Sequence, residues 1–197
     1  AGTCNAHICL LHGAVYMVFS EMCDGSAFNK NGNDRRKEGM NLFHKLFSGK
    51  QADDSGWKEK TILCPVEGKV IPLSEVGDPV FAQGILGPGV GIEPEEGMLY
   101  APVDGVVSAV YPTGHAIGLC SKDGMEILIH IGIDTVAMRG NGFTNRVKQG
   151  QKVRAGEVLS EFDIEKIRQA GHAATTMLVV TNANEIGQVQ PEAYGEL

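Results

Sequence analysis

Every odd-numbered residue between Met125 and Ile133 is a large apolar side chain, whereas the even-numbered residues are mixed. Successive side chains of a β-strand point to opposite faces of a sheet, so residues two apart share a face. The pattern therefore predicts a strand over 125–133 with one wholly apolar face, which must be buried against a core. His130 occupies an even position and is expected on the opposite face, away from the core.

A turn and a second strand precede this segment. Lys122-Asp123-Gly124 is typical of a tight turn, and the stretch 115–121 before it predicts the partner strand of a β-hairpin. If the loop has two residues, either the first two or the last two of this turn, His115 lies opposite or diagonal to His130 on one face. A loop of odd length would place the two histidines on opposite faces. We expect a two-residue loop and therefore neighbouring imidazoles.

Two neighbouring imidazoles on such a face suit three roles. Phosphoryl transfer needs a neutral imidazole as the nucleophile and a donor for the transferred oxygens, and two histidines can divide these tasks. A catalytic zinc site needs a third protein ligand; Asp134 shares the parity of His130, but no carboxylate is spaced to complete a usual site. A purely structural pair is the third alternative. The residues alone leave all three open and favour phosphoryl transfer.

From about residue 61 onward, short apolar stretches alternate with glycine and proline. Glycine accounts for 26 of the 197 residues and aromatic residues for only 6%, which favours many tight turns between short strands. We expect a short helix at 164–171 and a simple turn at 87–91. Strands are expected at 62–72, 79–86, 98–100, 105–111, 115–121, 125–133, 157–163 and 176–181. The predicted class is all-β with little helix.

A strand-turn motif occurs twice in this region. Residues 64–70 (CPVEGKV) are echoed by residues 101–107 (APVDGVV), and residues 77–82 (GDPVFA) by residues 150–155 (GQKVRA). Repetition of one supersecondary unit predicts two similar half-sheets that face each other and bury a single core. The sequence therefore predicts an antiparallel β-sandwich or flattened barrel with an internally duplicated strand-turn motif.

Net charge, hydropathy and cysteine content indicate which compartment and which classes of partner to expect. Seventeen basic and twenty-four acidic side chains give a formal net charge of −7, the wrong sign for a nucleic-acid partner. The most apolar run, Cys9 to Phe19, falls well short of the roughly twenty residues that span a bilayer, and no basic residue precedes it as in a secretory signal. Five cysteines without regular spacing favour free thiols. We expect a cytoplasmic protein.

These residues together resemble a known family. The run from Gly124 to Val136 (GMEILIHIGIDTV) is similar to the central motif of the glucose-type IIA component (EIIA, type 1) of the bacterial phosphoenolpyruvate-dependent sugar phosphotransferase system. Thr113-Gly114-His115, residues 101–105 and residues 150–156 support the resemblance, which extends over about 61–190.

The resemblance implies an antiparallel β-sandwich that carries a phosphoryl group and needs no cofactor or metal. It implies that His130 accepts this group through Nε2 from the phosphocarrier protein HPr and passes it to a cysteine on the IIB domain of a sugar permease. His115 would support the phosphoryl group, and Thr113 would orient His115. The implied partner-docking surface consists of Asp78, Val80, Phe81, Ile131, Asp134 and Val136.

Other interpretations use the same residues. A histidine-based metal-binding or regulatory domain of the same fold is the alternative, and regulated transporters or enzymes would bind the same surface. Biotin- and lipoyl-carrier domains resemble residues 101–105 and 150–156, but they need a modifiable lysine at a hairpin tip. Lys122 lies in a turn without the flanking pattern of such a lysine, so the phosphoryl carrier is preferred.

The resemblance divides the chain into three parts. Residues 1–39 have no counterpart in the family, and we expect Met40 to be the native start; a cysteine and histidine cluster between residues 4 and 23 is an alternative zinc site. Residues 40–60 combine a short amphipathic segment at 40–47, expected to contact a membrane surface weakly, with a polar linker. Residues 61–197 form the expected IIA domain, without its last strand.

Overall fold

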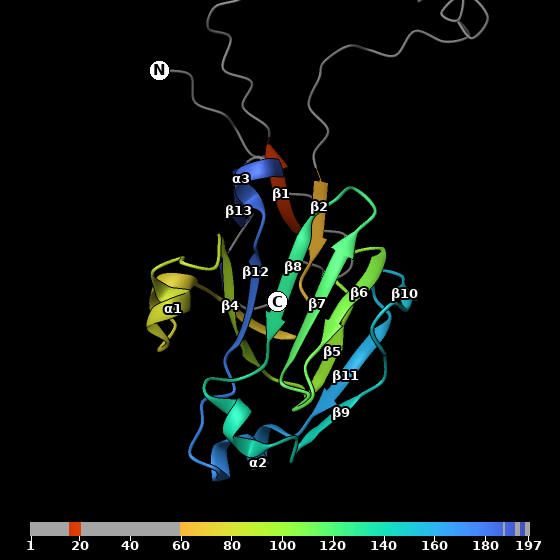
Figure 1. Ribbon diagram of the computed structural model, residues 1–197. Coiled ribbons are helices and arrows are strands. Elements are labelled where there is room, and N and C mark those ends of the chain that lie inside the picture. Colours follow the sequence, from red (N-terminus) through yellow and green to blue (C-terminus); the bar gives the residue numbers. More distant parts are fainter. Residues whose placement is uncertain (1–15, 21–59, 187, 192–193, 196–197) are drawn as a thin grey trace, which may run out of the picture.

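The computed structural model describes residues 16–20, 60–186, 188–191 and 194–195. Strands dominate this part of the chain, and all of their pairings are antiparallel (Figure 1). The α-helices are short, namely α1 (Pro79–Ala82), α2 (Ile164–Gln169) and α3 (Ala183–Ile186). The predicted all-β class with little helix is confirmed.

The strands form three sheets. The largest contains β3 (Gly68–Pro72), β4 (Gly89–Pro94), β6 (Gly105–Val110), β7 (Ala116–Ser121), β8 (Glu126–His130), β10 (Lys152–Val153) and β12 (Thr176–Val180), in the order β10-β6-β7-β8-β12-β4-β3. The second contains β5 (Met98–Tyr100), β9 (Phe143–Asn145) and β11 (Val158–Phe162), with β11 central. The third contains β1 (Tyr16–Ser20), β2 (Lys60–Leu63) and β13 (Gln188–Pro191), with β1 central.

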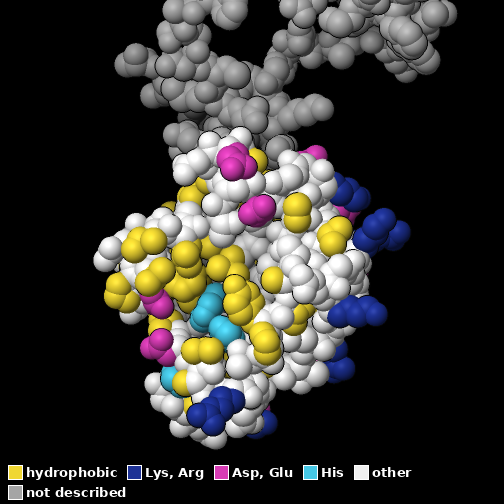
Figure 2. Space-filling view, in the orientation of Figure 1, with side chains coloured by type: hydrophobic (Ala, Val, Ile, Leu, Met, Phe, Trp, Pro, Cys, Tyr) yellow, Lys and Arg dark blue, Asp and Glu magenta, His cyan; other side chains and the backbone are white. Residues whose placement is uncertain are grey.

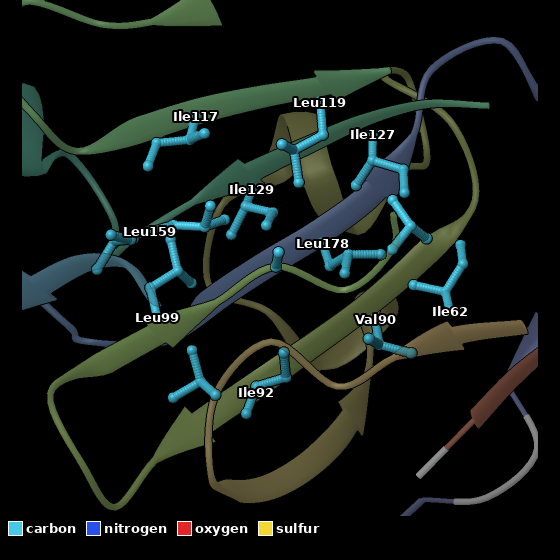
Figure 3. Close-up of a cluster of buried hydrophobic side chains, with 14 of the residues drawn as sticks. Ile62, Val90, Ile92, Leu99, Ile117, Leu119, Ile127, Ile129, Leu159 and Leu178 are labelled. Carbon is cyan, nitrogen blue, oxygen red and sulfur yellow. The ribbon is translucent and has the colours of Figure 1, made fainter. Parts of the chain in front are cut away.

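The main core lies between the seven-stranded sheet and the sheet of β5, β9 and β11. Figure 3 shows side chains from both sheets pointing toward one another. Leu99 and Leu159 come from the smaller sheet, and Ile117, Ile129 and Leu178 from the larger one; all five are fully buried. Two sheets that bury one apolar layer between them form a sandwich. The predicted architecture is therefore confirmed.

A second, smaller core covers part of the outer face of the large sheet. Met177 and Val179 of β12 point to this side and pack with Phe81 of α1, while Leu178 faces the main core. All five residues of β12 are buried as a result. In the sheet register Met177 is the partner of His130, so His130 lies at the border of this second core.

One of the two predicted repeats is present in the structure. Each copy, 64–70 and 101–107, makes a turn that leads into a strand, β3 or β6. The copies are joined reciprocally, because the Leu63 amide donates to the Pro102 carbonyl oxygen (2.9 Å) and the Tyr100 amide donates to the Pro65 carbonyl oxygen (2.8 Å). Leu63 corresponds to Tyr100, and Pro65 to Pro102, each 37 residues further along the chain. The duplication is therefore structural as well as sequential.

The other repeat is not structural, and the strand predicted at 79–86 is wrong. This stretch begins with α1, whereas its counterpart leads into β10. The Asp78 side chain caps α1 by accepting a hydrogen bond from the Val80 amide (2.8 Å), and Pro79 occupies the first helical position. A capping aspartate followed by proline favours the start of a helix.

Two more expectations are corrected. The stretch 62–72 is divided between β2 and β3 by the intervening turn. The stretch 87–91, predicted as a turn, contains the start of β4, where Gly89 permits close approach to β12: a Cβ at this position would lie 1.9 Å from the carbonyl oxygen of Leu178. The strands β1, β4, β9, β10 and β13 were not predicted. The remaining predicted strands and the predicted helix are confirmed, with small differences at their ends.

Some predictions concern residues that the structure does not describe. The amphipathic segment at 40–47 and the cysteine and histidine cluster between residues 4 and 23 both lie outside the described residues. Within the described residues, the helices are all too short or too polar to cross a bilayer.

Candidate functional site

The two histidines meet on the face of the hairpin that turns away from the main core. His130 is the last residue of β8, and His115 immediately precedes β7. Their ring centroids are 4.8 Å apart, with an angle of 75° between the ring planes. In Figure 2, two histidine side chains lie together on the surface with hydrophobic side chains around them. The prediction of neighbouring imidazoles is confirmed.

The predicted hairpin loop is nevertheless wrong. Ala116 is the register partner of His130 and Cys120 that of Glu126. The Ser121 amide also donates to the carbonyl oxygen of Met125 (2.9 Å), which leaves three residues, 122–124, in the loop. An odd loop was expected to separate the histidines. It does not, because His115 lies outside β7 and follows Gly114, whose φ of +72° bends the backbone. The alternation of a regular strand therefore does not extend to His115.

The His130 ring is held through Nδ1. This nitrogen lies 2.8 Å from the carbonyl oxygen of Gly132, and because a carbonyl oxygen only accepts, Nδ1 carries the proton. The other nitrogen, Nε2, then has a free lone pair. Burial lowers the pKa of His130 below its usual value of 6.5, although the bond to Gly132 and the carboxylates of Asp78 and Asp134 act in the opposite direction. The ring is thus kept neutral near pH 7.

The backbone after β8 is shaped to present this carbonyl group. Gly132 has φ +74°, and a Cβ there would lie 2.4 Å from Cγ2 of Thr135 and 2.9 Å from the carbonyl oxygen of Ala173. Thr135 begins a 3-10 helix (Thr135–Met138), and its hydroxyl group donates to the carbonyl oxygen of Ile131. Only glycine fits at position 132, so the anchor of His130 depends on this residue.

The His115 ring is also held through Nδ1, but by a different kind of partner. Oγ1 of Thr113 lies 2.5 Å from this nitrogen, and a hydroxyl group can either donate or accept. The His115 side chain is only 6% exposed. Its pKa is lowered by burial and, to a smaller extent, by the charge of His130. If the hydroxyl group donates, the Nε2 atom of His115 carries the proton and can donate to an anion.

Aromatic rings pack against both imidazoles. The ring centroid of Phe81 is 5.4 Å from that of His130, and the ring centroid of Tyr111 is 5.7 Å from that of His115, both in edge-to-face geometry. Sequence reasoning placed Phe81 in a docking surface and overlooked Tyr111 and Gly132. Tyr111 begins the same short connection as Thr113, which is the one signal in the sequence that points to it.

The predicted docking residues fall into two groups. Asp134, Val80 and Val136 are exposed, the two valines to 43% and 53%, and Asp78 is half-buried. Ile85, 66% exposed, was not predicted; its amide donates to the carbonyl oxygen of Val80 (3.2 Å), so it lies beside that residue. We call Val80, Ile85 and Val136 the apolar rim.

Phe81 and Ile131 do not lie on this exposed surface. Phe81 is 4% exposed and belongs to the second core, and Ile131 is fully buried in the main core. Ile131 has odd parity like the other core residues of its strand, so its side chain faces inward. The expectation that Ile131 contacts a partner is therefore corrected. Phe81 instead packs edge-to-face against the His130 ring.

The described residues offer other places where a ligand could bind, but none combines groups of comparable reactivity. Within the described residues no group of three or more histidine, cysteine, aspartate or glutamate side chains is arranged to hold a metal ion. A hollow of about 640 Å³ lies between β5, β9, β11 and the start of α2, and it is lined by neither histidine. The histidine pair is therefore the arrangement with the clearest chemical use: one free nitrogen lone pair beside a second imidazole that can donate.

Known proteins resemble this chain over most of its described residues. Residues 60–186 match the family model described as phosphoenolpyruvate-dependent sugar phosphotransferase system, EIIA 1. The chain is 39% identical over 158 residues to the PTS system glucose-specific EIIA component of Halalkalibacterium halodurans, covering 79% of this chain and 91% of that protein. A solved structure, the glucose permease IIA from Mycoplasma capricolum, superposes with a TM-score of 0.64 at 37% identity, covering 69% of this chain and 88% of the other.

Longer proteins contain a similar region. The PTS system beta-glucoside-specific EIIBCA component of Dickeya chrysanthemi is 45% identical over 147 residues, which is 75% of this chain but only 23% of that protein. The chain thus spans less than a quarter of the length of this relative. The family model nevertheless covers most of the described residues, and it includes both histidines. The chain belongs to the EIIA 1 family of the phosphoenolpyruvate-dependent sugar phosphotransferase system.

Proposed function

We propose that this protein is a phosphoryl carrier of a sugar phosphotransferase system. His130 accepts a phosphoryl group from phosphorylated HPr and passes it to the IIB domain of a sugar permease, in support of sugar uptake with phosphorylation. The observation that carries this proposal is the 2.8 Å contact between Nδ1 of His130 and the carbonyl oxygen of Gly132. It leaves Nε2 unprotonated, as a nucleophile requires.

Each transfer exchanges one bond to phosphorus for another. In the first step the Nε2 lone pair of His130 forms a bond to phosphorus, while the bond between phosphorus and HPr breaks and its electron pair returns to HPr. In the second step a cysteine thiolate of the IIB domain attacks phosphorus, and the electron pair of the N–P bond returns to His130. The protein has little covalent work to do beyond placing donors around the transferred group.

His115 and Thr113 support the transferred group in this proposal. The Thr113 hydroxyl group donates to Nδ1 of His115, so that the Nε2–H of His115 donates to a phosphoryl oxygen as charge develops there. A centroid separation of 4.8 Å between the imidazoles leaves both rings within reach of one phosphoryl group. A donor fixed in advance and partly shielded from water stabilises such charge strongly.

The proposed docking surface is the apolar rim around the histidines together with its carboxylates. Val80, Ile85 and Val136 supply exposed apolar area, and Asp78 and Asp134 supply negative charge beside it. Such a surface suits partners whose contact face is apolar and basic. HPr and the IIB domain would use it in turn, and regulated transporters or enzymes would compete for it.

The proposal holds for more than one sugar. The relatives named above are specific for glucose and for beta-glucosides, whereas a carrier of this kind contacts proteins only. We place the protein in the cytoplasm, where HPr and the IIB domains of permeases act. A weak membrane-surface contact through residues 40–47 remains a prediction about residues that the structure does not describe.

A reconstituted relay tests this function. The purified protein is incubated with radiolabelled phosphoenolpyruvate, enzyme I and HPr, after which an isolated IIB domain is added. We expect one label per chain that moves to the IIB domain, no label on His130→Ala, and a label on His115→Ala that moves on slowly. His172→Ala serves as the control, because this histidine lies outside the pair. Full labelling of His130→Ala would refute the proposal, as would a wild-type protein that takes up no label.

A further inference from the structure

Four aromatic rings form a continuous row through the site. Tyr111 contacts His115, His115 contacts His130, and His130 contacts Phe81, with centroid separations of 5.7, 4.8 and 5.4 Å. The angles between successive ring planes are 63°, 75° and 61°, so every contact is edge-to-face. This is the geometry that aromatic pairs prefer. The two imidazoles occupy the middle of the row, and the two carbocyclic rings close its ends.

The two end residues differ in their surroundings. Phe81 is 4% exposed and belongs to the second core, so packing alone accounts for it. Tyr111 is 45% exposed and is a member of neither core cluster in the described part of the chain. Its one ring contact there is with His115. A large ring left half in solvent stabilises the fold little, so its contact with His115 calls for another explanation.

The backbone of Tyr111 fixes the start of the connection that carries His115. Its amide donates to the carbonyl oxygen of Ala116 (3.0 Å), and its carbonyl oxygen accepts from the Gly114 amide (2.8 Å). Thr113 lies within the same closed turn. The ring of Tyr111 and the hydroxyl group of Thr113 therefore both reach His115 from one hydrogen-bonded segment.

A single hydrogen bond does not fix the plane of an imidazole. The contact between Thr113 and Nδ1 restrains one atom of the His115 ring, and the ring can still tilt about that atom. An aromatic ring packed against it removes this freedom. We propose that Tyr111 is a positioning residue, which holds the His115 ring so that its Nε2–H stays directed at the phosphoryl group on His130. This inference rests on the proposed phosphoryl relay.

Kinetics separate positioning from docking. A misplaced donor lowers kcat for transfer to the IIB domain, whereas the loss of a docking contact raises KM. Because the contact is made by the ring and not by the hydroxyl group, Tyr111→Phe keeps it and Tyr111→Ala removes it. Tyr194→Ala is the matched control, since Tyr194 is similarly exposed, at 52%, and makes no ring contact with either histidine.

The experiment measures onward transfer and the His115 ring in the same four proteins. For Tyr111→Ala we expect kcat to fall on the order of tenfold with KM nearly unchanged, and the NMR-detected pKa of His115 to rise toward its usual value because the ring loses cover. Tyr111→Phe and Tyr194→Ala should behave as wild type in both measurements. If Tyr111→Ala does not fold, Tyr111→Leu keeps apolar bulk without the ring and takes its place.

Three results would overturn the inference. The first is an unchanged kcat in Tyr111→Ala, and the second is a rise in KM alone, which would assign Tyr111 to docking. The third is a Tyr111→Phe protein as impaired as Tyr111→Ala, which would assign the effect to the hydroxyl group. If the wild-type protein takes up no label, the proposed relay fails instead, while the His115 resonances still report whether Tyr111 restrains the ring.

Discussion

The carbonyl oxygen of Gly132 accepts a hydrogen bond from Nδ1 of His130, two residues earlier in the chain, over 2.8 Å. The contact fixes both the orientation of the imidazole and the nitrogen that bears its proton. It arises where β8 ends and the backbone turns through a glycine with positive φ. The chemistry of the site therefore depends on a local backbone geometry that only glycine supports without strain.

Replacing this glycine should disturb both stability and transfer. Gly132→Ala adds a Cβ within 2.4 Å of the Thr135 side chain at a φ of +74°, so left-handed strain of about 1–2 kcal/mol is joined by overpacking of about 1–3 kcal/mol. Gly124→Ala is the control: its φ is +83°, but nothing lies within 4 Å. Urea unfolding should show a clearly larger loss for Gly132→Ala, and only this variant should take up label slowly. Equal losses would contradict the account.

Removing the Thr113 hydroxyl group should impair onward transfer more than labelling. Thr113→Val leaves Nδ1 of His115 without its partner at 2.5 Å, and the net value of such a bond, about 1 kcal/mol, corresponds to roughly a fivefold slower step. Thr113→Ser keeps the hydroxyl group and should transfer at nearly the wild-type rate. Rapid-quench measurement of transfer to the IIB domain checks this. A serine variant as slow as the valine variant would argue against the hydrogen bond.

The two histidines should make stability depend on pH in a defined direction. Burial lowers the pKa of both His130 and His115 below the usual value of 6.5, so the unfolded chain binds protons more readily than the folded protein. Stability should therefore be constant above about pH 7 and fall as the pH drops through and below 6.5. The lowered pKa values of Asp104 and Asp163 affect stability only below about pH 4.

Urea unfolding between pH 8 and pH 5 tests this dependence. The double variant His115→Gln/His130→Gln should lose less stability than wild type over this range, because it lacks the two groups whose protonation is disfavoured in the folded state. Parallel curves for the two proteins would mean that the histidines are not shielded from protons.

Cys64 should be chemically inert. Burial raises its pKa to about 11, so only on the order of one thiol in a thousand is ionised at pH 8. Alkylation with iodoacetamide at pH 8, followed by mass spectrometry of the peptide that contains Cys64, should find it largely unmodified in the folded protein and fully modified in urea. Rapid modification of the folded protein would contradict the burial of this side chain.

Much of the fold was predictable because the core pattern is local. The apolar positions of 125–133 alternate with a period of two, and this alone places His130 on the face away from the main core. The loop length was not predicted correctly. Ser121 determines it, since its hydroxyl oxygen accepts from the amides of Asp123 and Met125 at 3.2 and 3.0 Å. A serine before a turn was the available signal in the sequence, and the prediction did not use it.

Other parts of the site needed the tertiary structure. The pair Asp78-Pro79 is a local signal for the start of a helix. The prediction of a strand at 79–86 did not take this signal into account. The contact of Phe81 with His130, in contrast, joins residues far apart in sequence, and no periodicity predicts it. The burial of Ile131 follows from its parity, but the family resemblance placed it on the surface. Local patterns thus located His130, and packing determined its neighbours.

The atom that carries the phosphoryl group decides whether His130 is the carrier. The protein, labelled with ¹⁵N in its histidines, is phosphorylated through enzyme I and HPr and examined by NMR. The account predicts one phosphoryl group on Nε2 of His130, with the proton retained on Nδ1 where Gly132 accepts it. Phosphorylation of Nδ1 of His130, or of any other residue, would contradict it.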